Sequence, residues 1–237
     1  MNEEYLPLMI KAKAIKAFRN QWGIAVLVAL FVGVFELVSN ATTTITDIVT
    51  NKKEFVEVLG ETMVDKVCQF YDKWYVELLI VSLAVNLFVT IIQYGYNKIY
   101  IDIIRGKDAR FSTVFDGFLY PVKAVATEIY VMVLIIMWMF LLIVPGIVAI
   151  FKYSMTHYII AENPDIPITD AVDMSKNMME GHKTEYFMLI TSFLPWLFVI
   201  VLTFGLASIY VVPYMNTSLA QFYVQVKSEY EVENGEE

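Results

Sequence analysis

Apolar residues gather into long stretches along this chain, and polar segments separate them. A helix that crosses a bilayer needs about 20 mostly apolar residues, because the hydrocarbon core is about 30 Å thick. Few charged residues interrupt the apolar stretches. The pattern predicts an all-α fold, a polytopic membrane helical bundle of about six transmembrane helices. The predicted spans are about 22–38, 74–96, 124–144, 147–161, 186–204 and 206–224.

The third and fourth predicted spans share one apolar block, 124–161, which is too long for a single crossing. Pro145 and Gly146 divide this block. Proline lacks a backbone N–H donor and glycine accepts a positive φ, so the pair favours a turn between two antiparallel helices. The alternative is one kinked helix, which would reverse the placement of every later segment.

Two polar segments carry a helical periodicity of their own. In 5–20 and again in 111–118, apolar residues recur three or four positions apart. Such patterns predict cytoplasmic amphipathic helices that lie at the membrane interface. The apolar positions are Leu8, Ala12, Ile15 and Phe18 in the first segment, and Phe111, Val114, Phe115 and Phe118 in the second.

The longest polar segment outside the predicted spans is 39–73, where charges interrupt the apolar positions every few residues. We predict that it forms a small extracellular cap and does not cross the membrane. Residues 1–228 are expected to form a single membrane domain. The remaining residues, 229–237, are predicted to be an acidic flexible tail, because a charged segment cannot bury enough apolar surface to fold.

Composition and charge support a membrane location and orient the spans. Of the 237 residues, 58% are hydrophobic and 18% charged, whereas a soluble domain is about half apolar and about a quarter charged. Twelve of the 17 lysines and arginines lie in the N-terminal arm, the 97–123 and 162–185 loops and the tail, against four in 39–73. Since positive residues favour the cytoplasmic side, both termini are predicted to be cytoplasmic. No basic patch with interleaved aromatics is present, so no nucleic-acid partner is expected.

Lys152 is the strongest candidate for a functional residue, because it lies within the predicted fourth span. A charged group at that depth costs several kcal/mol unless it is paired or hydrated. Tyr153 and His157 follow it and make the candidate intramembrane site polar. Lys152 either extends its stem to the interface or faces a polar cavity and an anionic partner. His157 points about 140° away from it around the helix, so the two do not form a proton relay.

The sequence offers no catalytic centre. It lacks His-x-x-x-His, a Gly-rich phosphate loop and Gly-x-Ser-x-Gly, and Cys68 is its single cysteine. We therefore expect no enzyme activity, no cofactor and no metal site. Further candidates are residues that bind cytoplasmic partners or lipid headgroups. They are Arg105, Lys107, His182 and Lys183.

Several segments occur together in a recognisable combination. They are Ile104–Lys107, the run LLIVPGIVAIFKYSMTHYIIAENPDI, the run 175–183 and Val212–Tyr214. Over nearly the whole chain the combination resembles an uncharacterised bacterial family of integral membrane proteins, domain of unknown function nine-seven-five. Segment 39–73 departs from the family pattern, because it is longer and more acidic. The resemblance implies a multi-pass protein of the bacterial plasma membrane and offers no established reaction.

Two functions fit these observations. The first is a non-enzymatic accessory in export, envelope maintenance or protection against membrane-active peptides. Its partners would be membrane lipids, and another membrane protein or a peptide or lipid ligand. The alternative is a small transporter or lipid-handling protein that uses the polar site around Lys152. A membrane-embedded enzyme is disfavoured, because no nucleophile, acid–base pair or metal cluster can be assembled from the sequence.

Overall fold

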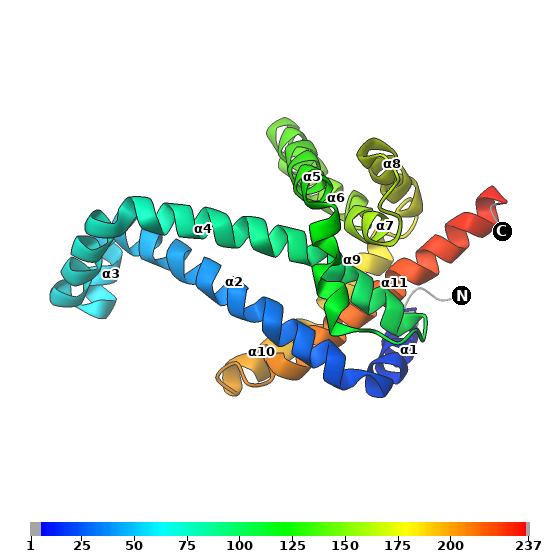
Figure 1. Cartoon of the computed structure of the whole chain (residues 1–237), viewed down its shortest axis with the longest axis horizontal. Helices are drawn as coiled ribbons and strands as arrows, with labels where there is room; N and C mark the ends of the chain where they lie inside the picture. Colours follow the sequence, from blue (N-terminus) through cyan, green and yellow to red (C-terminus); the bar gives the residue numbers. More distant parts are fainter. Residues whose placement is uncertain (1–5, 236–237) are drawn as a thin grey trace. The chain divides into compact units, whose positions relative to one another are not determined.

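In a computed structural model of the chain, residues 6–235 are described, and within that range no strand occurs. The predicted all-α helical architecture is confirmed (Figure 1). The α-helices are α1 (Leu6–Asn20), α2 (Trp22–Thr50), α3 (Lys52–Leu59), α4 (Glu61–Ile104), α5 (Pro121–Leu141), α6 (Ile143–Lys152), α7 (Thr156–Glu162), α8 (Ile168–Met178), α9 (Lys183–Thr191), α10 (Leu194–Leu202) and α11 (Ser208–Asn234). A 3-10 helix, η2 (Phe111–Leu119), lies between α4 and α5.

The chain divides by its internal contacts into two compact units. The hairpin unit is Phe31–Thr90. The bundle unit combines Met1–Leu30 with Ile91–Glu237. Helices α2 and α4 each begin in one unit and end in the other.

Five helical segments of the described chain are long and apolar enough to cross a membrane. They are Trp22–Thr50, Glu61–Ile104, Pro121–Leu141, Ile143–Glu162 and Lys183–Leu202. Large apolar side chains on them are exposed, for example Phe140 at 87% and Leu202 at 78%. An apolar surface of this extent marks contact with lipid or protein and not with water. By length and composition, the chain fits a membrane-spanning protein.

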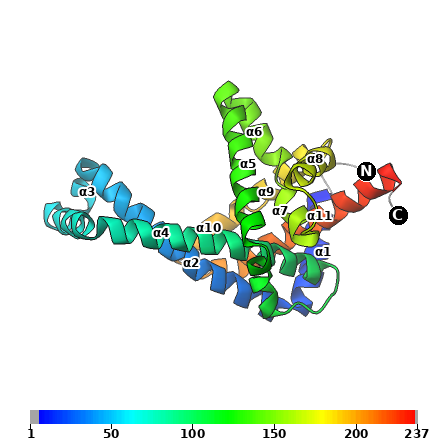
Figure 2. The same cartoon turned by 45° about the horizontal axis from the view of Figure 1, so that its top comes forward.

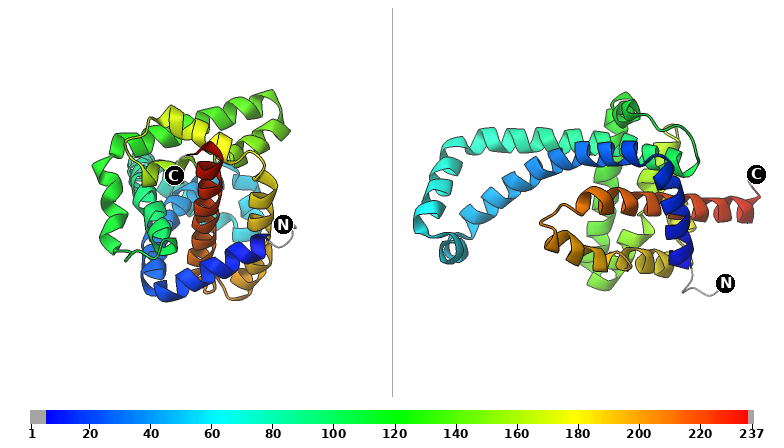
Figure 3. Two further views of the ribbon diagram at one scale, coloured as in Figure 1. Left: turned by 90° about the vertical axis from the view of Figure 1, so that its right-hand side faces the viewer. Right: turned by 90° about the horizontal axis from the view of Figure 1, so that it is seen from below.

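Helix α11 contains all but the first two residues of the predicted sixth span, 206–224, but it is not among the five candidate spans of the described residues. Its middle is polar, with Thr217 and Ser218 fully buried and their hydroxyls donating to the backbone carbonyls of Pro213 and Tyr214. Figure 3 (left) shows α11 passing through the middle of the bundle unit. Neighbouring helices cover it, so it does not need the apolar circumference of a lipid-facing span.

The turn in the long apolar block lies at Leu142, three residues before the predicted Pro145-Gly146 turn. Leu142 has an extended backbone, and α6 then packs along α5 as a hairpin, so the single kinked helix is not formed (Figure 2). An ideal Cβ on Gly146 would lie 2.9 Å from Cα of Met139. Pro145 occupies the first turn of α6, where a missing N–H costs no helical hydrogen bond. The proline therefore lies in the first turn of α6 and does not form the turn between α5 and α6.

Two further predicted spans are interrupted. The fourth, 147–161, is divided between α6 and α7 at residues 153–155, and the fifth, 186–204, between α9 and α10 at residues 192–193. Buried Ser175 of α8 supports the first break: its Oγ donates to the Lys152 carbonyl (3.0 Å) and accepts from the Met155 N–H (3.2 Å). Because a side chain 20 residues away satisfies these backbone groups, the break is stable within an apolar block.

Segment 39–73, for which a small extracellular cap is predicted, is helical over most of its length. It comprises the end of α2, the short α3 and the start of α4, and only single residues separate these helices. Polar residues do not stop the helices, because threonine hydroxyls bond to carbonyls one turn back, as Thr43 does to Ser39 (3.1 Å) and Thr50 to Thr46 (2.8 Å). Within the hairpin unit, Phe35 packs on Phe88 with ring centroids 4.6 Å apart.

The two segments for which amphipathic helices are predicted are helical in the structure. Helix α1 buries Pro7, Ile10, Ala14 and Phe18, whereas predicted Leu8 is exposed. It packs against α11 (Figure 3, right), so it belongs to the bundle instead of only lying on a membrane surface. The second segment is the 3-10 helix η2, which buries Val114 and Gly117.

The predicted flexible tail is largely helical in the structure. Helix α11 continues to Asn234 and ends at Gly235, which has a φ of 71°. Residues 236–237 lie outside the described residues. Acidic side chains of this segment support the helix, because Glu231 pairs with Lys227 one turn earlier (3.5 Å) and Glu229 lies 3.5 Å from His182, outside α11.

Candidate functional site

Lys152 is the last residue of α6, beside the break between α6 and α7. Its ammonium lies over the rings of Trp138 and Tyr153, 5.4 Å and 5.6 Å from the ring centroids. The side chain is half-buried, and no carboxylate of the described residues lies within ion-pair distance of it. Cation–π contact with aromatic faces compensates part of the lost hydration.

A cleft of about 560 Å³ opens beside Lys152. We call it the Lys152 cleft. One wall is α5, which supplies apolar and aromatic side chains, and the other wall includes polar residues of α8. The lining residues are Tyr130, Leu134, Met137, Trp138, Leu141, Lys152, Tyr153, Thr169, Val172, Asp173 and Lys176. The cleft is therefore amphipathic, and its charged lining residues are Lys152, Asp173 and Lys176.

Packing beneath the cleft fixes its wall. Val131, Ala149, Tyr153 and Val172 form a buried cluster that joins α5, α6 and α8. The Trp138 indole N–H donates to the Tyr153 hydroxyl at 3.3 Å. The aromatic rings that face Lys152 are therefore held in place before any ligand arrives.

His157 is not part of this cleft. It lies on α7, and its Nε2 is 2.9 Å from a carboxylate oxygen of Glu128 on α5. Glu128 is more exposed than His157, with side-chain exposures of 54% and 30%. Lys152 and Tyr153 thus line the same cleft, whereas His157 takes part in a separate hydrogen-bond contact between α5 and α7.

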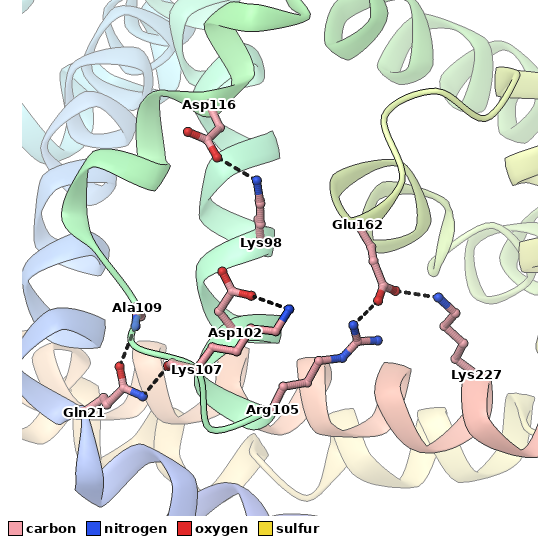
Figure 4. Close-up of polar contacts among 9 residues, drawn as sticks. All are labelled: Gln21, Lys98, Asp102, Arg105, Lys107, Ala109, Asp116, Glu162 and Lys227. Carbon is pink, nitrogen blue, oxygen red and sulfur yellow. Dashed lines mark hydrogen bonds and ion pairs between the residues drawn. The ribbon is translucent and has the colours of Figure 1, made fainter.

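A second charged group centres on Glu162, which ends α7. We call it the Glu162 cluster (Figure 4). Its carboxylate forms an ion pair with Arg105, accepts from Lys227 at 2.7 Å, and accepts from the Tyr223 hydroxyl at 2.5 Å. Lys227 also reaches Glu231 at 3.5 Å. The cluster joins the turn after α4 to α7 and α11. Its two cations and two carboxylates balance in charge, so it has no free charge for a ligand.

The other predicted cytoplasmic residues are dispersed. Lys107 lies 3.8 Å from Asp102 (Figure 4). His182 lies 2.7 Å from Glu185 and 3.5 Å from Glu229. Lys183 begins α9 and makes no ion pair with a described residue. Of the four predicted residues, Arg105 therefore belongs to the Glu162 cluster, whereas Lys107, His182 and Lys183 do not.

Sequence reasoning missed Glu162, Lys227 and Ser175. Glu162 carried a detectable signal, because it ends an apolar block directly before Asn163-Pro164. Ser175 and Lys227 carried none, since each acts only through a contact distant in sequence. Within residues 6–235, no group of three or more histidines, cysteines, aspartates and glutamates could hold a metal ion.

A family model described as "Protein of unknown function (DUF975)" matches residues 111–230, which is just over half of the chain. The matched region contains α5 to α10 and most of α11, and with them the Lys152 cleft. No curated protein and no solved structure matches this chain.

Proposed function

The chain belongs to this family of unknown function, and we propose that it is a non-enzymatic membrane protein that binds an anionic amphiphile in the Lys152 cleft. One observation carries the proposal. Lys152 is a half-buried cation that faces a cleft and has no carboxylate partner among the described residues. An unpaired cation in apolar surroundings is costly unless an anion joins it.

The chemistry of the lining defines the ligand class. Lys152 and Lys176 provide two positive charges and Asp173 one negative charge, so the polar end carries a net positive charge. Leu134, Met137 and Leu141 form an apolar wall suited to an acyl chain. A molecule with an anionic head and a hydrocarbon tail satisfies both parts of the cleft.

Exposed side chains on α5 support entry from the bilayer. Met137 and Leu141 line the cleft and are 57% and 69% exposed. An amphiphile already in the membrane could therefore reach Lys152 laterally, without passing through water. Lateral entry supports lipid handling over the broader transporter alternative. Transport would need a second opening of the cleft, through which the substrate leaves, whereas binding needs only one.

The accessory role in export, envelope maintenance or protection against membrane-active peptides stays a prediction. Binding of an amphiphile is compatible with each of these purposes. The absence of enzyme activity is likewise part of the proposal.

The test uses Trp138 as a reporter inside the cleft. Replacing Trp22, Trp74 and Trp196 by Phe leaves Trp138 as the single tryptophan of the four in the chain. The full chain is reconstituted in phosphatidylcholine vesicles that contain a minor fraction of phosphatidylglycerol with brominated chains. Bromine quenches nearby indole, so we expect quenching about tenfold stronger per lipid than with brominated phosphatidylcholine, as one desolvated charge pair allows.

Lys152→Met keeps the stem and removes the charge, so it should abolish the preference for phosphatidylglycerol. Lys53→Met is the matched control, because Lys53 is exposed in the hairpin unit and does not line the cleft. It should leave the preference unchanged. If Lys152→Met keeps the same preference as Lys53→Met, the cleft does not select an anion and the proposal fails.

A further inference from the structure

A second cleft lies in the bundle unit and shares no residue with the Lys152 cleft. We call it the basic cleft. It has a volume of about 510 Å³ and lies between α1, the end of α4 with its following loop, and α11. Its lining residues are Lys13, Lys16, Ala17, Asn20, Gln21, Ile103, Ile104, Gly106, Asp108 and Gln221.

The polar groups of the basic cleft suit an anion that also carries hydroxyls. Lys13 and Lys16 are exposed, one turn apart, and form no ion pair within the described chain. Asn20 and Gln221 add amide donors, and neither is hydrogen-bonded through its side chain to another described residue. Asp108 is the one carboxylate of the lining, and it can accept a hydrogen bond from a hydroxyl group of the ligand.

Hydrogen bonds fix the wall of the basic cleft before a ligand binds. The Gln21 side chain donates from Nε2 to the Lys107 carbonyl at 2.8 Å and accepts at Oε1 from the Ala109 N–H at 2.9 Å (Figure 4). Gly106, between Arg105 and Lys107, has a φ of 69°, a conformation that favours glycine. A preformed wall lowers the entropic cost of binding.

Helix α1 is equally well anchored. Lys11 donates to the Ser192 carbonyl at 2.9 Å and lies over the Phe193 ring at 3.9 Å. Burial lowers the pKa of Lys11. Phe18 is fully buried and packs edge-on against Tyr210, with ring centroids 5.5 Å apart. With its opposite face anchored, α1 presents Lys13 and Lys16 to the cleft from a fixed position.

The basic cleft lies beside the ends of two helices that contain candidate membrane spans. Candidate span α2 begins at Trp22, next to Gln21, and candidate span α4 ends at Ile104, which lines the cleft. The Trp22 side chain is 61% exposed. Tryptophan is enriched where a span meets the interface, and both span ends adjoin the same cleft.

From these observations we infer that the basic cleft binds a phosphate group, carried by the headgroup of an anionic phospholipid or present as a free phosphate. The two lysines neutralise the phosphate, the amides donate to its oxygens, and Asp108 accepts from a neighbouring hydroxyl. Ile103, Ile104 and Ala17 line the cleft beside these polar groups and can contact the glycerol and the first carbons of the acyl chains.

The experiment places the full chain in nanodiscs of phosphatidylcholine with a minor fraction of phosphatidylglycerol. Every chain compared here also carries Lys152→Met, so that the Lys152 cleft does not contribute to retention of the lipid. Native mass spectrometry measures the fraction of released protein that retains phosphatidylglycerol. Lys13→Gln with Lys16→Gln should lower this fraction about tenfold, since each lysine near a membrane surface contributes a severalfold preference for anionic lipid. Lys53→Gln with Lys66→Gln is the matched control, because it removes the same charge from exposed positions of the hairpin unit. It should change the fraction less than about twofold.

A further variant separates a built site from diffuse attraction. Gln21→Ala leaves the net charge unchanged and releases the loop at residues 107–109, so it should also lower retention, by about threefold. Inorganic phosphate is added in a parallel arm. If phosphate displaces the lipid from the Lys152→Met chain that keeps Lys13 and Lys16, free phosphate suffices; if it does not, the headgroup is the ligand. Equal retention by the Lys13/Lys16 and Lys53/Lys66 variants would overturn the inference, whatever the Lys152 variants do.

Discussion

At the residue scale, Glu162 has the most demanding position, because it neutralises cations from two elements. Replacing it by glutamine should leave Arg105 and Lys227 facing each other without the charge that separates them. Because the three side chains keep exposures of 16–32%, solvent screens part of the repulsion. We expect a loss of about 2 kcal/mol of unfolding free energy, measured as a lower Tm in detergent.

The matched control is Glu233→Gln, because Glu233 is an exposed acidic residue near the end of α11, the helix that carries Lys227, and forms no ion pair with a described residue. It should leave Tm nearly unchanged. A second variant, Glu162→Gln with Lys227→Met, should recover part of the lost Tm because it removes one of the two repelling cations. Equal Tm values for Glu162→Gln and Glu233→Gln would show that the cluster does not stabilise the fold.

The sequence could identify Lys152 but not the partners of Glu162. A lysine inside an apolar stretch stands out in a hydropathy pattern, because its position alone implies a cost. The pairing of Lys227 with Glu162 spans 65 residues and follows from how α7 and α11 pack. No local pattern carries that information.

At the element scale, two glycines allow η2 to pack on α4 through backbone contact. An ideal Cβ on Gly117 would lie 1.9 Å from the Ile91 carbonyl oxygen, and one on Gly95 would lie 2.2 Å from the Thr113 carbonyl oxygen. Gly117→Ala should therefore force η2 away from α4 and destabilise the chain by about 2 kcal/mol, the cost of overpacking. The readout is Tm, together with faster hydrogen exchange at residues 111–119.

Gly23→Ala provides the comparison, because Gly23 lies within α2 and a Cβ there would meet no atom within 4 Å. That change should raise or preserve Tm, since alanine favours a helix over glycine. A Gly117→Ala variant as stable as Gly23→Ala would contradict the close packing of η2 on α4.

Prolines explain why the predicted helix boundaries were displaced. Pro121, Pro145 and Pro195 all lie in the first turns of their helices, α5, α6 and α10. A backbone N–H in the first turn has no acceptor within the helix, so proline, which lacks this N–H, is favoured near the start of a helix. The sequence predicts a turn at Pro145 and places Pro195 inside a span, whereas each break between helices lies two or three residues before its proline.

At the scale of the whole molecule, the predicted orientation can be tested with the native cysteine. Cys68 is the single cysteine and is partly exposed. If segment 39–73 is extracellular, a membrane-impermeant maleimide should label Cys68 in intact cells, because the reagent reaches only the outer face. The measurement is the mass increase of the purified chain.

The companion variant combines Cys68→Ser with Asn234→Cys, which moves the thiol to an exposed position at the end of α11. Since the C-terminus is predicted to be cytoplasmic, this thiol should react only after the cells are permeabilised. Labelling of position 234 in intact cells, with Cys68 protected, would reverse the predicted orientation.

The sequence by itself determined that the chain is helical and rich in segments able to cross a membrane. A bilayer imposes length and apolarity on each span locally, so these properties can be read from the sequence without knowing the fold. The tertiary structure decided where the apolar blocks break, that α11 runs through the bundle, and which charges meet. Those features depend on contacts between distant residues, such as Ser175 with Lys152 and Glu162 with Lys227, whose energies no hydropathy pattern contains.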